Sequence, residues 1–246
     1  MTHTKKKFVS NIQLDFSIGD IDPEGKFAPK KIDFNEYDQA FLQTEDNKVI
    51  MGFLYMNKDT PIIIPEPDPT ILYFTSAENS LLEILNLQSE ILNLTGLNNS
   101  EKIANLFYTF FQLSSNFVIN LFASLEAFNN GIIPNDFTHR IKRKLYDSNK
   151  IQRFLKFDTK VREVVPKIFE KSFIEDHPGK FENLNKMKKL RDNVIHMKNY
   201  SESFSASYRE LFRDYLSFNF ESAFNDTKEY VNYYKPNWIE NCDCGN

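Results

Sequence analysis

The pattern of apolar and polar positions changes once along the chain. Residues 8–18 alternate between apolar and polar side chains, which predicts a half-buried β-strand. Clusters of β-branched and aromatic residues predict further strands at 37–43, 49–55, 62–64 and 71–74. The prolines at positions 61, 65, 67 and 69 argue against a helix in this region. We therefore expect residues 1–75 to form a small β-rich or α+β module.

From residue 76 onward, the apolar positions recur at helical spacing. Ser76 is expected to cap a first helix that ends at Gly96. Ser100 then opens a long helix that stops at Asn129-Asn130-Gly131. Its apolar stripe consists of Ile103, Leu106, Phe107, Phe110, Leu113, Phe117, Leu121, Leu125 and Phe128. A rod of this length suits the spine of a helical bundle.

Shorter helices are predicted further along the chain. They cover 137–147, 159–173, a stretch from about Glu182 that follows a turn at Pro178-Gly179, and about 204–224. The predicted fold is mainly α, with an antiparallel helical bundle over residues 76–235 and a C-terminal tail over 236–246.

Composition supports a folded domain and gives no sign of a membrane protein. The 246 residues are 41% hydrophobic and include 24 Phe, enough for an aromatic core. No run reaches the roughly 18 apolar residues that a membrane span requires. The basic segment Thr4–Phe8 is not followed by an apolar signal core. We expect a cytoplasmic protein without a membrane partner.

The sequence offers little for a metal or a cofactor. The two cysteines, Cys242 and Cys244, could supply half of a metal site, but no His or further Cys lies nearby, so an inert tail is the preferred interpretation. Phosphate-binding loops, zinc-binding His-Glu-x-x-His and Gly-x-Ser-x-Gly motifs do not occur. We expect no cofactor and no disulfide.

Positive charge is concentrated in one part of the chain. The net charge is −4, yet residues 137–200 carry 17 Lys and Arg against 8 Asp and Glu, which leaves 13 basic and 26 acidic residues elsewhere. This region is suited to binding a polyanion. The alternative is that these side chains simply solvate exposed helix faces.

The segment Arg191-Asp192-Asn193-Val194-Ile195-His196 carries the candidate chemistry. Arginine binds phosphate through a planar fork, and histidine exchanges protons near neutral pH. On a helix, Asp192 and Asn193 border His196, whereas Arg191 lies about 140° round from it. A straight helix therefore does not aim both side chains at one phosphate, and a local bend or pairing with a second copy of the helix would be needed. The core-facing stripe of this helix is predicted to be Met187, Leu190, Val194 and Met197.

The same segment resembles the Arg-polar-x-x-x-His signature of the HEPN superfamily, which includes many metal-independent ribonucleases of prokaryotic defence and toxin systems. Arg191 matches the arginine, Asp192 or Asn193 the polar position, and His196 the histidine. Residues 123–128, Ala-Ser-Leu-Glu-Ala-Phe, are similar to the second helix of many members. The tyrosine of the His-x-Tyr form is missing, because Lys198 occupies its position. The resemblance implies an antiparallel helical bundle and a homodimer that brings the two motifs together.

An active protein of this kind would cut RNA by attack of the 2′-hydroxyl. His196 would accept or donate the proton, Arg191 would stabilise charge on the phosphoryl oxygens, and Asn193 would orient the imidazole or the phosphate. The sequence thus predicts a metal-independent endoribonuclease of a defence, stress or toxin–antitoxin system. An antitoxin or effector is a possible partner.

RNA contacts are expected from basic residues near the motif and from a second basic run. The candidates are Lys188, Lys189, Lys198, Arg140, Lys142 and Arg143. For the second run, a solvated helix face is the preferred interpretation, with contact to the RNA backbone as the alternative. The alternative function from another class is a non-catalytic helical binding protein, such as a complex subunit or the partner of a toxin.

Overall fold

The structure is a computed structural model. It describes residues 3–9, 39–43, 49–58, 60–94, 100–197 and 208–242. By its internal contacts the chain divides into two compact units, one made of Met1–Lys5 with Pro69–Asn246 and the other of Lys6–Asp68. Each unit is described here by itself.

The smaller unit is built on an antiparallel sheet in the order β1-β2-β3. Its strands are β1 (Gln39–Gln43), β2 (Val49–Asn57) and β3 (Thr60–Pro65). Gly52 of β2 allows β3 to approach closely, because a Cβ there would lie 2.7 Å from the Ile64 carbonyl oxygen. Val9 joins the sheet, since its N–H donates to Glu66 O at 2.8 Å.

The strands predicted at 49–55 and 62–64 are confirmed within β2 and β3. Of the segment predicted at 37–43, residues 39–43 form β1, and the first two residues lie outside the described residues. Residues 10–18 of the first predicted strand also lie outside them.

The strand predicted at 71–74 is wrong, because these residues belong to the first helix, α1 (Pro69–Asn93). Proline is well tolerated in the first turn of a helix, so Pro69 begins the helix rather than preventing it. Ile71 and Phe74 are buried at 2% and 0% exposure on the bundle side of α1. Ser76 is therefore no cap; its hydroxyl donates back to Leu72 O at 2.8 Å within the helix.

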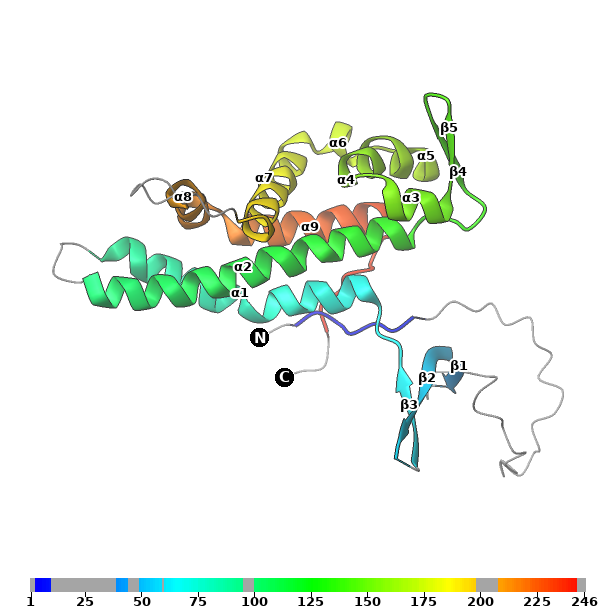
Figure 1. The fold of residues 1–246 in the computed structure, drawn as a ribbon, viewed down its shortest axis with the longest axis horizontal. Helices are drawn as coiled ribbons and strands as arrows, with labels where there is room; N and C mark the ends of the chain where they lie inside the picture. Colours follow the sequence, from blue (N-terminus) through cyan, green and yellow to red (C-terminus); the bar gives the residue numbers. More distant parts are fainter. Residues whose placement is uncertain are drawn as a thin grey trace. The chain divides into compact units, whose positions relative to one another are not determined.

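The larger unit is mainly helical (Figure 1). After α1 its elements are α2 (Ser100–Gly131), β4 (Thr138–Ile141), β5 (Lys144–Asp147), α3 (Ser148–Phe154), α4 (Phe157–Thr159), the π-helix η2 (Lys160–Val164), α5 (Val165–Phe169), α6 (Phe173–Asp176), α7 (Pro178–Ile195), α8 (Arg209–Ser217) and α9 (Phe220–Tyr234).

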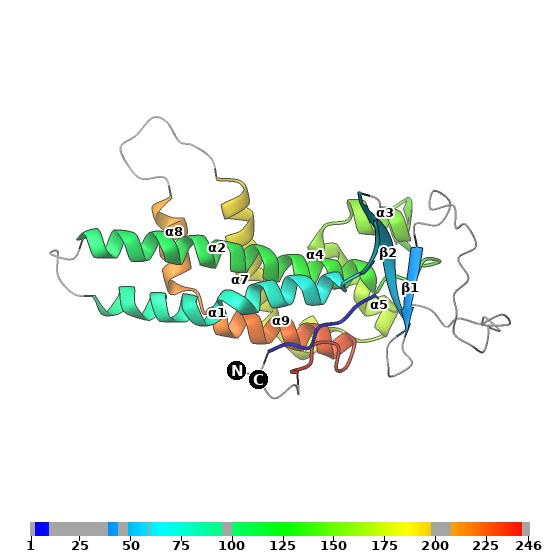
Figure 2. The same ribbon diagram turned by 90° about the horizontal axis from the view of Figure 1, so that it is seen from below.

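The long helices α1 and α2 form an antiparallel pair, and both views show α9 beside them and α7 crossing α2 (Figures 1 and 2). Aromatic side chains fill the space between them. Phe74 of α1 stacks on Phe224 of α9 with ring centroids 4.4 Å apart. Phe117 of α2 meets Phe220 edge to face at 5.6 Å. The expected aromatic core of a helical bundle is thus present.

Residues 137–147, predicted as a helix, instead form the antiparallel hairpin β4–β5. Its two-residue turn is Lys142-Arg143, and Lys142 adopts the left-handed backbone conformation with φ 54°. A helix was predicted because lysine and arginine are good helix formers. The prediction failed because the packing of alternate residues against the rest of the protein decides the local structure here.

The helices predicted at 159–173 and 204–224 are interrupted in the structure, and residues 204–207 of the second lie outside the described residues. Between α4 and α6 the chain passes through a π-helix, and Glu170 ends α5 in the left-handed conformation with φ 53°. Phe218 and Asn219 separate α8 from α9, and Asn219 caps α9 through a bond from the Ser222 N–H at 2.9 Å. Pro178 opens α7, so the predicted turn at this position is wrong.

The segment 236–242, predicted as part of a C-terminal tail, is anchored to the helical unit through Ile239. Ile239 is 1% exposed, and its N–H and C=O both bond to the Asn232 side chain, at 2.8 and 2.9 Å. The segment also pairs with the start of the chain, since the Lys5 N–H donates to Glu240 O at 2.8 Å. Cys242 forms no disulfide with a described residue, and Cys244 lies outside the described residues.

By length and composition α2 is apolar enough to cross a membrane, although no such segment was expected. Its most apolar stretch has a mean hydropathy of only 1.2, and 39% of that stretch is buried inside the protein. The buried side chains of α2 include Phe117, Leu121 and Leu125, which belong to the core that α1 and α9 share. The central helix of a folded bundle has this composition for reasons of packing.

Candidate functional site

The helix α7 carries the predicted motif and lies across α2. Its buried side chains are Phe181, Leu184, Met187 and Leu190, which hold it against the core. Met187 and Leu190 thus face inward as predicted, and Val194 packs partly against the same core. Met197 was predicted to belong to this stripe but is 40% exposed, because α7 has already ended at Ile195.

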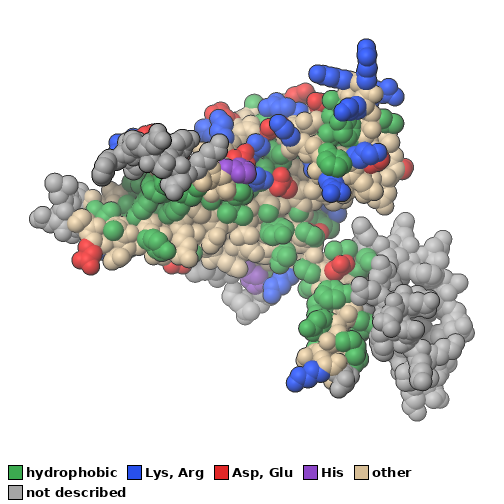
Figure 3. Space-filling view, viewed as in Figure 1, with side chains coloured by type: hydrophobic (Ala, Val, Ile, Leu, Met, Phe, Trp, Pro, Cys, Tyr) green, Lys and Arg blue, Asp and Glu red, His purple; other side chains and the backbone are tan. Residues whose placement is uncertain are grey.

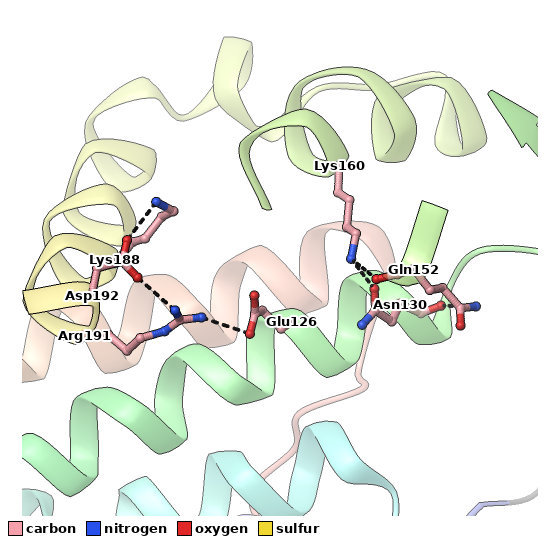
Figure 4. A network of polar contacts seen from close by, with 7 residues as sticks. All are labelled: Glu126, Asn130, Gln152, Lys160, Lys188, Arg191 and Asp192. Atoms are coloured by element: carbon pink, nitrogen blue, oxygen red, sulfur yellow. Dashed lines mark hydrogen bonds and ion pairs between the residues drawn. The ribbon is translucent and has the colours of Figure 1, made fainter. Parts of the chain in front are cut away.

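Arg191 is fixed at the contact between α7 and α2 (Figure 4). Its Nη2 donates to Glu126 Oε2 at 3.0 Å, and its Nη1 donates to Asp192 Oδ1 at 2.8 Å. The guanidinium lies over the Phe122 ring, 4.1 Å from the centroid. Such a stacked cation contributes about 0.5–2 kcal/mol, depending on its exposure. With the side chain 20% exposed, the guanidinium keeps access to solvent.

A second cation completes the charge balance of this cluster. Lys188 donates to Asp192 Oδ2 at 3.1 Å, four residues along α7, and lies 3.9 Å from Asp158 Oδ2. Asp192 therefore bridges Lys188 and Arg191 with its two oxygens. Two cations and three carboxylates, Glu126 included, leave this cluster with a formal charge of −1.

Lys160, the first residue of the π-helix η2, is buried. It contacts α2 one turn beyond Glu126. Lys160 donates to Asn130 Oδ1 at 2.6 Å and to Gln152 O at 2.7 Å (Figure 4). Burial lowers the pKa of Lys160, and the nearby Glu126 carboxylate opposes this change. Glu126 and Asn130 are four residues apart on α2, so one face of α2 receives both Arg191 and Lys160.

His196 stands apart from this cluster. It follows the last residue of α7 and caps the helix through its backbone N–H, which donates to Asp192 O at 3.1 Å. The imidazole is exposed and makes no hydrogen bond or ion pair with any residue that the structure describes. Asn193 is also exposed. The structure thus brings together Arg191 and Asp192, but neither Asn193 nor His196 joins them within one chain.

The lysines predicted to bind RNA differ in their surroundings. Lys188 is engaged by carboxylates, as described above. Lys189 is exposed and lines a cavity of about 450 Å³ together with Lys186, Asn183 and Asp214, between α7 and the α8–α9 junction. Lys198 lies outside the described residues. The two adjacent lysines therefore face different sides of α7.

The second predicted RNA-binding group lies on the hairpin. Arg140 is an exposed residue of β4, and Lys142 and Arg143 form the turn. The neighbouring His139 is buried at 2% exposure, with Nε2 3.1 Å from Glu163 Oε2 and Nδ1 3.4 Å from Lys167 Nζ. Figure 1 shows the hairpin beside α3 and α5, away from α7.

Some residues of the Arg191 cluster were not singled out from the sequence. Glu126 was noted only as part of a family-like segment, and Phe122 and Lys160 were not considered. A signal existed for Glu126, because it borders the predicted apolar stripe at Leu125 and lies four residues after Phe122. Its partner on α7 could not be found without the crossing of the two helices.

The fold and the cluster define a mainly helical protein with a partly exposed arginine at a helix crossing. Among the described residues, no group of three His, Cys, Asp or Glu side chains is placed to hold a metal ion. Comparisons with family models, curated proteins and solved structures gave no match to this chain. The functional argument therefore starts from the geometry of the chain itself.

Proposed function

We propose that this chain is a metal-independent endoribonuclease with a HEPN-like fold, in which Arg191 and His196 act on the RNA phosphodiester. The observation that carries the proposal is the pairing of Arg191 with Glu126 at the α2–α7 crossing, with His196 exposed at the end of the same helix. A fixed cation and a free imidazole are the two groups that this reaction requires.

The chemistry uses the nucleophile that RNA carries. One imidazole accepts the proton of the 2′-hydroxyl as the 2′-oxygen forms a bond to phosphorus. The bond from phosphorus to the 5′-oxygen breaks, and water donates a proton to that oxygen, so that each site uses one imidazole. Arg191 stabilises the charge that develops on the phosphoryl oxygens, and Asn193 orients the imidazole or the phosphate. The products are a 2′,3′-cyclic phosphate and a 5′-hydroxyl.

A second copy of the chain completes the proposed site. Arg191 and His196 lie about 140° apart round the axis of α7, so one chain does not point both at one phosphate. A two-fold axis beside the end of α7 would bring Arg191 of one copy toward the histidine of the other. Exposed apolar side chains flank His196, with Ile195 50% and Met197 40% exposed, and a homodimer would cover them.

The ion pairs of Arg191 leave room for a phosphate. A guanidinium has five N–H donors, and the described carboxylates engage one at Nη1 and one at Nη2. Asp192 also accepts from Lys188, so it stays paired if Arg191 turns from it to a substrate. Glu126 would keep the guanidinium in place meanwhile.

A second candidate function is a non-catalytic helical binding protein, such as a complex subunit or the partner of a toxin. One observation favours it: both terminal nitrogens of Arg191 already bond to carboxylates, as in a purely structural ion pair. In that case the substitution of Arg191 changes stability or association, and no RNA is cut.

For the biological setting we propose a cytoplasmic defence, stress or toxin–antitoxin system, with an antitoxin or effector as a further partner. Lys189 and Lys198 would contact RNA near the motif, and Lys188 would contribute less because Asp192 and Asp158 neutralise it.

The test is cleavage of single-stranded RNA in EDTA, with analysis of the product ends. Wild type is expected to give 2′,3′-cyclic phosphate ends, and His196→Ala to lower the rate roughly 10²–10⁴-fold, the usual contribution of one acid–base group. His177→Gln is the matched control, because His177 precedes the other end of α7 and packs on Phe173 and Tyr233. Wild type that binds RNA or a partner but never yields these ends would decide for the binding protein.

A further inference from the structure

The β4–β5 hairpin is a two-stranded ribbon that has one buried and one exposed face near its base. The pair His139↔Tyr146 lies on the inner face, and the neighbouring pair Arg140↔Leu145 lies on the outer face. His139 is buried against Glu163, and Tyr146 packs against a small apolar cluster beneath the hairpin. Side-chain anchors of this kind hold the base of the ribbon while its turn extends into solvent.

The exposed part of this ribbon carries four cations within five residues. Arg140, Lys142, Arg143 and Lys144 are all exposed, and none makes an ion pair or a side-chain hydrogen bond with another described residue. Figure 3 shows Lys and Arg side chains gathered over β4 and β5. The one acidic residue of the strands, Asp147 at the base, already pairs with Lys150 at 2.8 Å.

The turn holds a lysine where the backbone favours glycine. In a two-residue hairpin turn, positions with positive φ are normally occupied by Gly, Asn or Asp. Lys142 has φ 54° instead, and other residues are disfavoured in this conformation by roughly 1–2 kcal/mol. Local strain of this kind is often retained where the side chain is useful. The strained position places a positive charge at the outermost point of the ribbon.

We propose that the β4–β5 hairpin is a docking arm for the phosphate backbone of double-stranded nucleic acid. The major groove of B-form DNA admits a two-stranded ribbon, and on any duplex the cations of the turn and outer face would reach the phosphates along the groove edges. The exposed Leu145, 54% accessible, lies beside Arg140 and would contact sugar edges.

Double-stranded nucleic acid fits this surface better than a single strand does. Proteins that bind single strands combine basic grooves with aromatic side chains on which the bases stack. The aromatic residue of the strands, Tyr146, lies on the inner face and is not available for stacking. The exposed face offers charge and presents no aromatic residue of the strands, which suits recognition by shape and backbone.

This inference goes beyond the proposed ribonuclease site, because it concerns binding at a different place and does not require cleavage. If the chain does cut RNA, the hairpin would hold a duplex segment of the substrate while the end of α7 acts on an unpaired region.

The experiment measures binding of labelled duplexes of about 16 base pairs, a length that double-stranded RNA-binding modules span. Full-length His196→Ala protein is used so that no substrate is cut, and affinity is measured by anisotropy over a series of salt concentrations. The hairpin variant combines Arg140→Gln, Lys142→Gly and Arg143→Gln. We expect it to bind duplex on the order of 10²-fold more weakly at 0.1 M salt, with the salt slope reduced by about 2 to 3.

The matched control removes the same charge elsewhere with Lys102→Gln, Lys180→Gln and Lys228→Gln. These lysines have partners in Glu90, Glu229 and Asn241 and lie on other helices. The control is expected to keep the wild-type salt slope. Because glycine suits the left-handed turn, the hairpin variant should unfold at the same temperature as wild type or higher.

Three results would overturn the proposal: no duplex binding by the parent protein, equal duplex affinity of the hairpin variant and parent, or hairpin-dependent binding of anionic lipid vesicles in place of duplex. Separate double-stranded RNA and DNA arms identify which backbone is bound, and either one supports the proposal. Duplex binding by a wild-type protein that never cuts RNA would contradict the ribonuclease and leave the docking arm intact.

Discussion

Two basic regions of this protein look alike in sequence and differ in what their charges do. On α7, Lys188 and Arg191 are engaged by Asp158, Asp192 and Glu126. On the β4–β5 hairpin, the four exposed cations have no partner among the described residues. The first arrangement fixes two helices and positions one guanidinium, whereas the second leaves charge available for a polyanion.

The comparison shows that a count of positive residues does not measure a binding surface. Exposed, unpaired cations release counterions when they meet phosphates, which gives a salt-dependent affinity. Cations already held by carboxylates bring less net charge to the encounter. The region 137–200 is strongly basic as a whole, but only part of that charge is free.

The largest expected effect comes from a change that keeps the charge at position 191 of α7 and removes the planar geometry of the guanidinium. Arg191→Lys keeps the charge and loses the planar fork, so RNA cleavage is expected to fall roughly 10²–10³-fold, as when one group that stabilises the transition state is removed. The matched control is Arg162→Lys, because Arg162 also stacks on a phenylalanine, Phe181, at 5.2 Å. Single-turnover cleavage rates measure both. Equal losses from the two variants would show that Arg191 has no special role.

A smaller effect is expected when one lysine on the hairpin and one lysine on α7 are replaced in turn. Lys142 has no partner among the described residues, whereas Lys188 is bound by carboxylates. Lys142→Gly should weaken duplex binding about eightfold at 0.1 M salt and lower the salt slope by about 0.9, the contribution of one phosphate contact. Lys188→Gln removes the same charge, yet its carboxylate partners should limit the loss to about twofold. Anisotropy titrations of the two single variants give the answer. A larger loss of duplex affinity for Lys188→Gln than for Lys142→Gly would contradict the proposed difference between the two basic regions.

The smallest effect concerns stability. Glu126→Gln removes one partner of Arg191, and because Glu126 is 45% exposed, the free energy of unfolding should fall by only about 0.5–1 kcal/mol. The loss should shrink at high salt, where partly exposed charges are screened. Urea unfolding at two salt concentrations measures it, with Lys142→Gly expected to show no loss. A salt-independent loss would mean that packing of the side chain, not charge, is responsible.

The mainly helical fold was predictable because burial imposes a regular period on long segments. The stripe on α2, from Ile103 to Phe128, repeats often enough to identify the helix and its end at Gly131. Short segments contain too few repeats of the pattern to identify the element in this way. Residues 71–74 and 137–147 were misassigned because a few β-branched or basic residues fit either structure, and their packing partners decide.

Half of the candidate site was also visible in the sequence. The angle between Arg191 and His196 follows from helical geometry, and the structure shows Arg191 against α2 and His196 exposed. The pairing with Glu126 depends on where α7 crosses α2, which no local pattern encodes. The strained turn at Lys142 was missed for the same reason, since its φ is set by the register of β4 and β5.

The central claim is that Arg191 of one copy acts with His196 of another, and mixing two inactive variants tests it most directly. Arg191→Ala and His196→Ala proteins would be co-expressed with different tags, and the mixed dimers compared with each variant alone in RNA cleavage. The account predicts recovery to about a quarter of the wild-type rate, because random mixing makes half of the dimers mixed and each of these keeps one of its two sites. A mixture no more active than its components, beside an active wild type, would contradict it.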